Sequence, residues 1–329
     1  MTSLSVLRVL DLSEGVAGAF CTKLLAGFGA DVIKIERPGG GDPLRRHGPF
    51  PDDLPHPEKG ALFLYLNTRK KSITLDIAQR SGALILRRLV EEAEVVVESF
   101  PPGYLAELGL GYESLARIKP RLVMTSVTPF GQDGPYAGYR ATNLTVFAAG
   151  GQMAVTGEPD REPLKNGGYQ AEYQAGLHAF AATAVVAFSA DATEVGQHID
   201  IAAMECLVTA LEPHVSSWAY LRRDIGRRRG NVESARAPIA PVHTVQDLLE
   251  APHLRARPDG RPSGRGFFQE VEHPAAGRLV YPGSPFRLGA IPWQAVRAPL
   301  LGEHNEEIYC GELELSREEL VVLRASGII

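Results

Sequence analysis

The first 36 residues alternate between strand-like and helix-like patterns, and this alternation constrains the fold more than any other feature of the sequence. Residues 6–12 form a short apolar run, which predicts a buried strand. Residues 15–30 carry apolar side chains at helical spacing, and residues 31–36 predict a second strand. A strand–helix–strand unit implies parallel strands joined by a right-handed crossover.

The same alternation continues along the chain. Further strands are predicted at residues 72–76, 94–99, 122–128 and 198–201, and helices at 82–92, 172–188 and 204–222. One side of the helix at 172–188 carries the apolar residues Leu177, Ala181, Ala184, Val185 and Phe188. Strands and helices in this order predict an α/β fold with a doubly wound, largely parallel sheet.

The composition excludes several classes of protein. The chain has 329 residues, 44% of them hydrophobic, which is enough for one large core and a second small one. The net charge is −5, so no general attraction to nucleic acid or to an anionic membrane is expected. The three cysteines are widely spaced, which argues against a disulfide scaffold and against a cysteine-rich zinc module.

Membrane and metal signals are also missing from the sequence pattern. No apolar run reaches the roughly 18 residues that a membrane span needs. The first residues lack the basic-then-apolar pattern of a signal peptide. We see no histidine or carboxylate cluster with metal-ligand spacing. These features predict a soluble, cytoplasmic protein without a metal site.

The composition changes near residue 230. Proline, glycine and arginine dominate residues 235–265, with one short helix predicted at 244–250. We therefore divide the chain into a large domain at 1–231 and a smaller second part at 232–329.

Two sequence features could bind an anion. The turn at residues 13–18 leads from the first strand into a helix, so it offers free backbone N–H groups, although it lacks the GxGxxG spacing. Basic residues lie beside predicted strand ends, namely Arg37, Arg45, Arg46, Arg69, Lys70 and Lys71. Ligands bind outside the carboxyl ends of strands in open α/β sheets, and Arg and Lys there suit phosphate groups.

Glu172 begins the long helix just after Gly167 and Gly168. The helix dipole favours a carboxylate in the first turn, so one interpretation is an ordinary helix-start charge. The other is a nucleophilic carboxylate, which can exchange a thioester for an anhydride. The residue types alone leave both interpretations open.

Several segments together resemble the class III coenzyme A-transferases, the CaiB/BaiF family, which also holds carnitine-CoA transferases and α-methylacyl-CoA racemases. The resemblance is carried, in the family's order, by VLRVLDLSEGVAGAFCTKLLAGFGADVIKIERPGGGDPLR, NTRKKSITLDI, VVVESFPPGYLAELGLGYESLARIKPRLVMTSVTPFGQDGPYAG and VGQHIDIAAMEC, and in the tail by VHTVQDLLEAPHLRAR, APLLGEHNEEI and LRASGII.

The resemblance implies a Rossmann-like large domain at 1–231 that binds coenzyme A (CoA), and a truncated small domain followed by a tail that returns to the large domain at 232–329. It also implies an interlocked homodimer, with a hetero-oligomer as the alternative. The substrates would be an acyl-CoA and a carboxylic acid. The implied CoA-binding residues are Val16, Ala17, Arg37, Leu75, Lys71 and Arg140.

Two positions depart from the family pattern. The family's catalytic aspartate heads a D-x-x-A/S-G helix start, and Glu172 stands in its place here. The extra methylene moves the carboxylate by roughly 1.5 Å. In addition, residues 232–236 replace a much longer stretch of the small domain. In the family that stretch carries the glycine-rich loop that covers the partner's active site.

Three functions follow from the resemblance. The first is a CoA-transferase in which Glu172 forms an anhydride and then an enzyme thioester. The second is a catalytically weak or inactive CoA-binding subunit. The third is an α-methylacyl-CoA racemase, which needs a His-Asp pair after the GPYAG loop, where this chain has Thr142 and Asn143.

Overall fold

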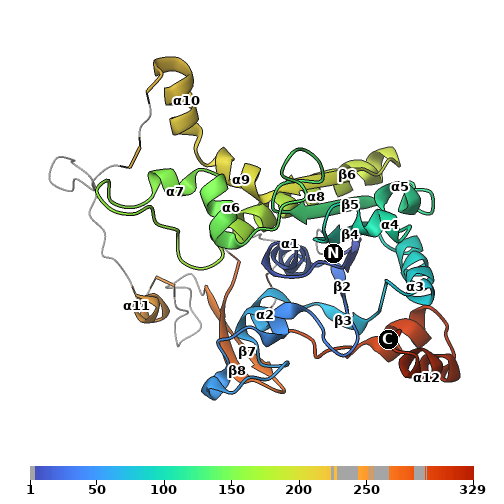
Figure 1. Ribbon diagram of the computed structural model, residues 1–329. Coiled ribbons are helices and arrows are strands. Elements are labelled where there is room, and N and C mark those ends of the chain that lie inside the picture. The colour runs from blue at the N-terminus through green and yellow to red at the C-terminus, as the bar shows by residue number, and fades with distance from the viewer. Residues whose placement is uncertain are drawn as a thin grey trace.

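Six parallel strands form the main sheet in the computed structural model, which describes residues 4–223, 226–227, 244–251, 253–254, 267–284, 293 and 295–329 (Figure 1). The strands are β1 (Arg8–Asp11), β2 (Asp31–Glu36), β3 (Lys71–Thr74), β4 (Val95–Glu98), β5 (Val123–Thr128) and β6 (His198–Ala202). They follow the order β3-β2-β1-β4-β5-β6 across the sheet. The predicted α/β fold with a largely parallel sheet is confirmed.

Helices and short turns surround this sheet. They are α1 (Val16–Gly27), α2 (Ala61–Leu66), α3 (Arg80–Glu91), α4 (Tyr104–Glu107), α5 (Tyr112–Leu115), α6 (Asn143–Ala149), α7 (Gln152–Val155), α8 (Gln170–Thr193), α9 (Ala203–Thr209), α10 (Glu212–Leu221), α11 (Val245–Glu250) and α12 (Arg317–Ala325). Shorter helical turns lie at Pro43–Arg46, Pro51–Asp53 and Glu307–Glu312.

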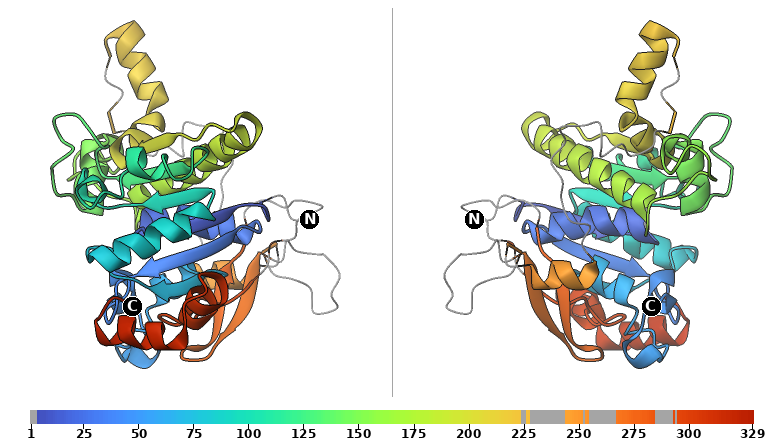
Figure 2. Two further views of the ribbon diagram at one scale, coloured as in Figure 1. Left: turned by 90° about the vertical axis from the view of Figure 1, so that its right-hand side faces the viewer. Right: turned by 90° about the vertical axis from the view of Figure 1, so that its left-hand side faces the viewer.

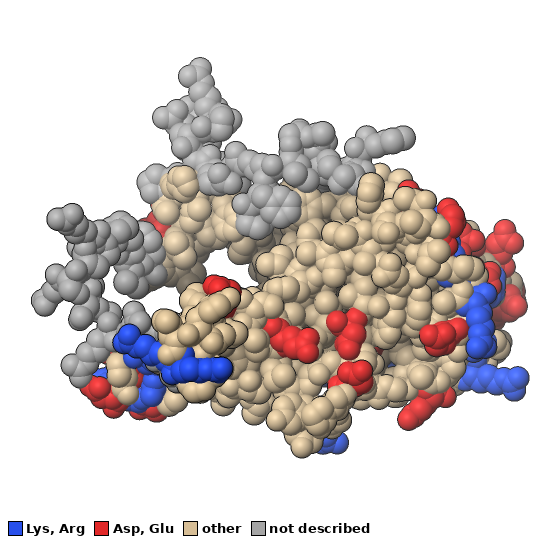
Figure 3. All heavy atoms as spheres, turned by 90° about the horizontal axis from the view of Figure 1, so that it is seen from above, with Lys and Arg blue, Asp and Glu red and all other residues tan. Residues whose placement is uncertain are grey.

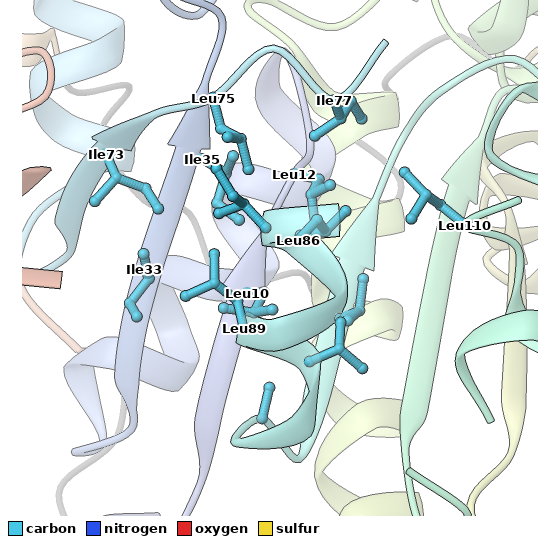
Figure 4. Close-up of a cluster of buried hydrophobic side chains, with 14 of the residues drawn as sticks. Leu10, Leu12, Ile33, Ile35, Ile73, Leu75, Ile77, Leu86, Leu89 and Leu110 are labelled. Carbon is cyan, nitrogen blue, oxygen red and sulfur yellow. The ribbon is translucent and has the colours of Figure 1, made fainter. Parts of the chain in front are cut away.

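Both faces of the sheet are buried, because alternate residues of each strand point to opposite sides. Leu10 and Ile33 face α3 in the cluster drawn in Figure 4. Val9 and Val32 face the other side, where the cluster includes residues of α1 and α8. Burial on both faces explains why the sequences of the strands are nearly continuous apolar runs.

Helix α8 packs its small residues into the core. The sequence pattern suggested instead that the side with the larger apolar residues would be buried. Its buried residues are Ala171, Ala175, Gly176, Ala179, Thr183, Ala187 and Ala190. Leu177, Val185 and Phe188 are exposed by 50%, 69% and 80%. The reason is close packing on α1, because a Cβ at Gly176 would lie 2.5 Å from the Ala17 carbonyl oxygen.

By length and composition alone, α8 could cross a membrane, and among the described residues it is the one helix that meets these two criteria. A core helix of a soluble protein passes the same test. Here α8 contributes to the core that covers β4 and β5.

The helix predicted at 204–222 is two helices, α9 and α10. Pro213 lies in the first turn of α10, where a missing N–H is tolerated, whereas within one long helix it would break a hydrogen bond. Helix α10 has no buried residue and projects from the body of the molecule (Figure 2).

The last third of the chain adds a hairpin that the sequence did not predict. Strands β7 (Phe268–His273) and β8 (Gly277–Pro282) pair antiparallel. The hairpin packs on α2, where the Tyr65 and Tyr281 rings lie 5.9 Å apart. The predicted short helix at 244–250 is α11, with Thr244 as its N-cap.

The C-terminal segment 295–329 lies against the main sheet beside β3. Ile308, Tyr309 and Leu320 belong to the same core as the strands. The Tyr309 hydroxyl donates to the Thr74 carbonyl oxygen at 2.6 Å. This end of the chain therefore closes one face of the sheet.

A buried ionic network lies under the carboxyl ends of β1 and β2. Lys70 Nζ is 2.9 Å from Asp11 Oδ2, and Lys34 Nζ is 2.9 Å from Asp42 Oδ2 and 3.8 Å from Asp11 Oδ1. Burial alone would raise the pKa of Asp11, but Lys34 and Lys70, with hydrogen bonds from two hydroxyls, hold it at about 2. Asp11 is therefore ionised and shared by two lysines.

Replacing Asp11 should strongly destabilise the fold, because two buried ammonium groups would lose their shared counter-ion. We expect Asp11→Ala to lower the free energy of unfolding by about 3–5 kcal/mol. The control is Asp31→Ala, whose side chain is 42% exposed and should cost less than about 1 kcal/mol. Urea denaturation measures both values, and equal losses would contradict a structural role for the network.

Candidate active site

A groove runs along the carboxyl edge of the sheet, where β1 and β4 lie next to each other. The strand order reverses at this point, since β2 and β3 lie on one side of β1 while β4, β5 and β6 lie on the other. Open α/β sheets bind ligands at such a crevice. Two cavities open there, and Glu14 lines both of them.

The first cavity is lined by a guanidinium group and by two aromatic rings. Arg37 follows β2, Leu75 follows β3, and both line the cavity. Arg37 is exposed, and its guanidinium has no hydrogen-bond or ion-pair partner among the described residues. Phe100 and Tyr104 also line this cavity, with ring centroids 5.0 Å apart. A guanidinium suits a phosphate, and a pair of rings suits a flat heterocycle.

The second cavity has a volume of about 220 Å³ and includes the start of α1. Gly15 is the N-cap at φ 80°, and no side chain caps the helix there. The first backbone N–H groups of α1, at Val16 and Ala17, are therefore available to a polar ligand.

The buried ionic network fixes the turn that leads into α1. Ser13 Oγ donates to Asp11 Oδ1 at 2.5 Å, and Lys34 Nζ donates to the Ser13 carbonyl oxygen. Gly18 is needed beside this turn, because a Cβ there would lie 2.3 Å from Ser13 Cβ. The groove floor is thus held from below by buried charges.

Glu172 lines the second cavity from the first turn of α8. It is half-buried, and burial raises the pKa of its carboxyl, while its own backbone N–H and the Lys165 charge act in the opposite direction. Asn143 Nδ2 donates a hydrogen bond to Glu172 Oε2. A partly desolvated carboxylate in a cavity can serve as a nucleophile or as a general base.

The walls around Glu172 are mostly apolar or small. They come from β5, α6, α8 and α9, through Val127, Val146, Ala171 and Ala203. Thr128 and Thr142 add hydroxyl groups. Such a pocket partly excludes water from the carboxylate, which is required for a reactive acyl intermediate to survive.

The structure divides the predicted CoA-binding residues and the predicted nucleophile Glu172 into three groups. Arg37 and Leu75 line the first cavity, and Val16, Ala17 and Glu172 line the second. Arg140 is exposed in the loop before α6 and lines neither cavity, although its neighbour Ala141 lines the second.

Lys71 lies at the amino ends of the strands, whereas the groove lies at their carboxyl ends. This differs from the position beside the groove that the sequence analysis expected for Lys71. It begins β3, so it sits at the amino end of that strand, beside the start of β2. Its Nζ lies 3.3 Å from Asp31 Oδ1 and 3.0 Å from Glu307 Oε1. A basic residue beside a predicted strand can lie at either end of it, and the sequence alone does not decide which.

Two other basic residues predicted beside strand ends, Lys70 and Arg45, form buried ion pairs. Lys70 contacts Asp11, as described above. Arg45 is fully buried, pairs with Glu36 and Glu58 at 2.6 Å each, and lies 3.8 Å from the centre of the Phe63 ring. These cations stabilise the fold and are not available to a ligand.

Sequence reasoning did not identify Phe100, Tyr104 or Asn143 as site residues. Phe100 and Tyr104 belong to a segment quoted for the family resemblance, and an aromatic pair just after a strand was the available signal. Asn143 was noted only where the racemases carry a His-Asp pair, and its contact with Glu172 was not predicted, because it joins residues 29 positions apart.

A Ser–His pair lies outside the groove. Ser126 Oγ and His198 Nε2 are 2.8 Å apart on the neighbouring strands β5 and β6. Glu98 forms hydrogen bonds with Ser126 and with the Phe100 backbone N–H, and not with His198. In a catalytic triad the acid orients the histidine, so this arrangement does not match one. Among the described residues, no group of three or more His, Cys, Asp or Glu could hold a metal ion.

Comparisons with known proteins agree on one family. The family model described as CoA-transferase family III matches residues 4–238 and 230–305. The succinyl-CoA:(R)-benzylsuccinate CoA-transferase subunit BbsE of Thauera aromatica is 30% identical, over 92% of this chain and 93% of that protein. A succinate–glutarate CoA-transferase of Agrobacterium fabrum is 39% identical, over 75% of this chain and 62% of that protein.

Solved structures agree with the sequence relatives. A CaiB/BaiF family protein from Brucella suis superposes with a TM-score of 0.82 at 26% identity, over 94% of this chain and 99% of that one. The alignment with the Thauera protein spans 392 positions, more than the 329 residues of this chain, so that relative contains residues that this chain lacks. The matched segments, the relatives and the shared fold show that the chain belongs to CoA-transferase family III, the CaiB/BaiF family.

Proposed function

We propose that this protein moves coenzyme A between an acyl-CoA thioester and a carboxylic acid, with Glu172 as the nucleophile. The observation that carries the proposal is a half-buried carboxylate facing a cavity in the groove at the carboxyl edge of the sheet. The relatives named above are CoA-transferases, which act on CoA thioesters.

The groove has the parts that an extended CoA molecule needs. We assign the phosphates to Arg37 and the adenine ring to the side of the first cavity formed by Phe100 and Tyr104. The pantetheine arm then passes Glu14, which both cavities share, and the first turn of α1. This path brings the thioester to Glu172.

The reaction proceeds by two acyl exchanges. The ionised Glu172 attacks the thioester carbonyl carbon and the carbon–sulfur bond breaks. The CoA thiolate departs, and the acyl group is now joined to Glu172 as a mixed anhydride. The thiolate attacks the Glu172 carbonyl of the anhydride, which releases the first acid as its carboxylate and leaves Glu172 as a CoA thioester. The acceptor carboxylate repeats these steps in reverse order and regenerates the free Glu172 carboxylate.

The racemase alternative is less favourable, because it needs a second base at the α-carbon. Thr142 caps the start of α6 through Thr145, and Asn143 is an amide that cannot accept a proton from carbon. No histidine lines the second cavity among the described residues.

A CoA-binding subunit is the second candidate, favoured by a specific observation. The two segments matched by the family model meet at residues 230–238, and the alignment with the Thauera relative is longer than this chain. We propose that the missing segment falls at this junction, between a large domain at 1–231 and a shortened remainder at 232–329. A partner chain could then supply the cover of the site, and one relative is itself named as a subunit.

We also propose that two copies form an interlocked dimer. The outer side of α8 exposes Leu177, Val185 and Phe188, and α10 exposes Trp218 by 55% without burying any residue. Seen from above, much of the described surface carries neither basic nor acidic side chains (Figure 3). Exposed apolar surface of this extent is typical of a contact with another chain.

Arg37 should be required for CoA binding and Lys71 should not. A charge-assisted contact is worth roughly 1.5–3 kcal/mol, so we expect Arg37→Ala to weaken the affinity for CoA by about tenfold or more. Lys71→Ala removes the same charge at the opposite edge of the sheet, so the affinity should stay within about twofold. Calorimetry with CoA measures both, and an unchanged affinity in Arg37→Ala would remove the phosphate assignment.

Glu172 should become acylated during turnover. A reactive acyl-CoA should leave an adduct on the peptide containing residues 171–176, and hydroxylamine should convert it to a hydroxamate on Glu172. Glu172→Gln should abolish turnover but keep CoA affinity, because the change is nearly isosteric. Glu172→Asp shortens the reach by roughly 1.5 Å and should lose activity if the surrounding residues fit glutamate. Wild-type protein without adduct or turnover on a broad donor panel would leave only the binding-subunit function.

The proposed dimer should persist on dilution, because linked chains separate only with partial unfolding. Phe188→Glu places a charge on the outer side of α8 and should disrupt assembly in analytical ultracentrifugation. The control is Val322→Glu on α12, a residue 65% exposed, which should sediment as wild type does. A wild-type monomer at low micromolar concentration would rule the dimer out.

A further inference from the structure

Asn143 is the first residue of α6 and the only described side chain that donates a hydrogen bond to the Glu172 carboxylate. A carboxylate only accepts, so the contacting atom must be the Nδ2 donor of the amide. The contact is made at Oε2, which leaves Oε1 without a side-chain donor among the described residues. One carboxylate oxygen is held while the other stays available to attack.

The position of Asn143 is fixed by the start of α6. Thr142 and Thr145 form a reciprocal capping box at this helix start, with Asn143 and Leu144 between them. Val146 and Phe147 then anchor α6 in the same buried cluster as Ala171 and Ala175 of α8. The starts of α6 and α8 therefore meet at the Asn143–Glu172 contact.

The other end of the Asn143 amide, its Oδ1, is buried and has no hydrogen-bond partner among the described residues. Asn143 does not line the cavity that Glu172 lines, so this oxygen is not offered to a ligand there. Leaving a buried acceptor unsatisfied costs about 1–3 kcal/mol, so the Nδ2 contact with Glu172 is kept at a cost in stability.

We propose that Asn143 is a positioning residue for the glutamate nucleophile: its Nδ2 holds Glu172 in the ionised, attacking position. This inference rests on the proposed function of Glu172. The amide compensates for the longer glutamate side chain, which has one more rotatable bond than aspartate and needs a fixed partner to keep its carboxylate in line.

Three variants test this role. Asn143→Ala removes both donor and acceptor, whereas Asn143→Asp keeps an acceptor but removes the donor and adds a negative charge. Thr145→Ala weakens the capping box and leaves the Asn143 amide in place, so it is the matched structural control. The thermal unfolding midpoint and the CoA affinity of each variant show whether its fold and binding groove are intact.

The rate of Glu172 acylation in a single turnover is the main measurement. A carboxylate released from its partner loses its alignment, so we expect Asn143→Ala to slow acylation by about tenfold to hundredfold. CoA affinity, which Arg37 and the aromatic pair set, should change far less. Thr145→Ala should acylate within about threefold of wild type. Wild-type acylation rates in Asn143→Ala, or an equal loss in Thr145→Ala, would overturn the proposal.

The pH dependence provides a signature that a structural role would not produce. Hydrogen bonding by Nδ2 stabilises the ionised carboxylate, so its removal raises the pKa of Glu172 and moves the acid limb of the acylation profile to higher pH. Asn143→Asp should move it further, because a second negative charge opposes ionisation of the first.

Carbon-13 NMR of the Glu172 carboxyl, assigned with Glu172→Gln, measures the same pKa without any reaction. Failure of Glu172→Gln to abolish turnover would reject the proposed function. An unchanged Glu172 pKa in Asn143→Ala would reject the role of Asn143, whichever way the turnover experiment ends.

Discussion

Asp11 is the group on which the rest of the active-site edge depends. It ends β1, it is fully buried, and its two oxygens are shared by Lys34, Lys70 and the hydroxyls of Ser13 and Thr22. Buried charges are costly unless they are paired, so each of these groups is held in place by the others. The turn between β1 and α1 is fixed as a result, and this turn separates the two cavities of the groove.

The groove is assembled from residues that contribute different kinds of interaction. Arg37 remains without a partner at one end, whereas nearby cations such as Arg45 are neutralised in the core. At the other end Glu172 is half-buried against apolar walls, which raises the pKa of its carboxyl. A single long ligand with a charged head and a reactive tail fits this distribution, and acyl-CoA has that form.

Helix α8 connects the core, the candidate nucleophile and the proposed dimer contact. Its small side chains approach α1 so closely that a Cβ at Gly176 would overlap the Ala17 carbonyl. This packing places the first turn of α8, and with it Glu172, beside the first turn of α1. The same packing turns Val185 and Phe188 outward. Because the small residues of α8 are the ones that pack on α1, the same packing determines the position of Glu172 and the exposure of the larger apolar residues.

The sequence by itself determined the six strands of the main sheet, their parallel arrangement and the place of Glu172 at a helix start, because these depend on local periodicity and chain order. The tertiary structure decided which charges remain free. Arg37, Lys70 and Lys71 look alike in sequence, yet only Arg37 reaches the groove, because Lys70 is neutralised in the core and Lys71 begins its strand instead of ending it. It also decided that Phe100, Tyr104 and Asn143 belong to the site, since their partners lie on other elements and converge only when the sheet and helices pack.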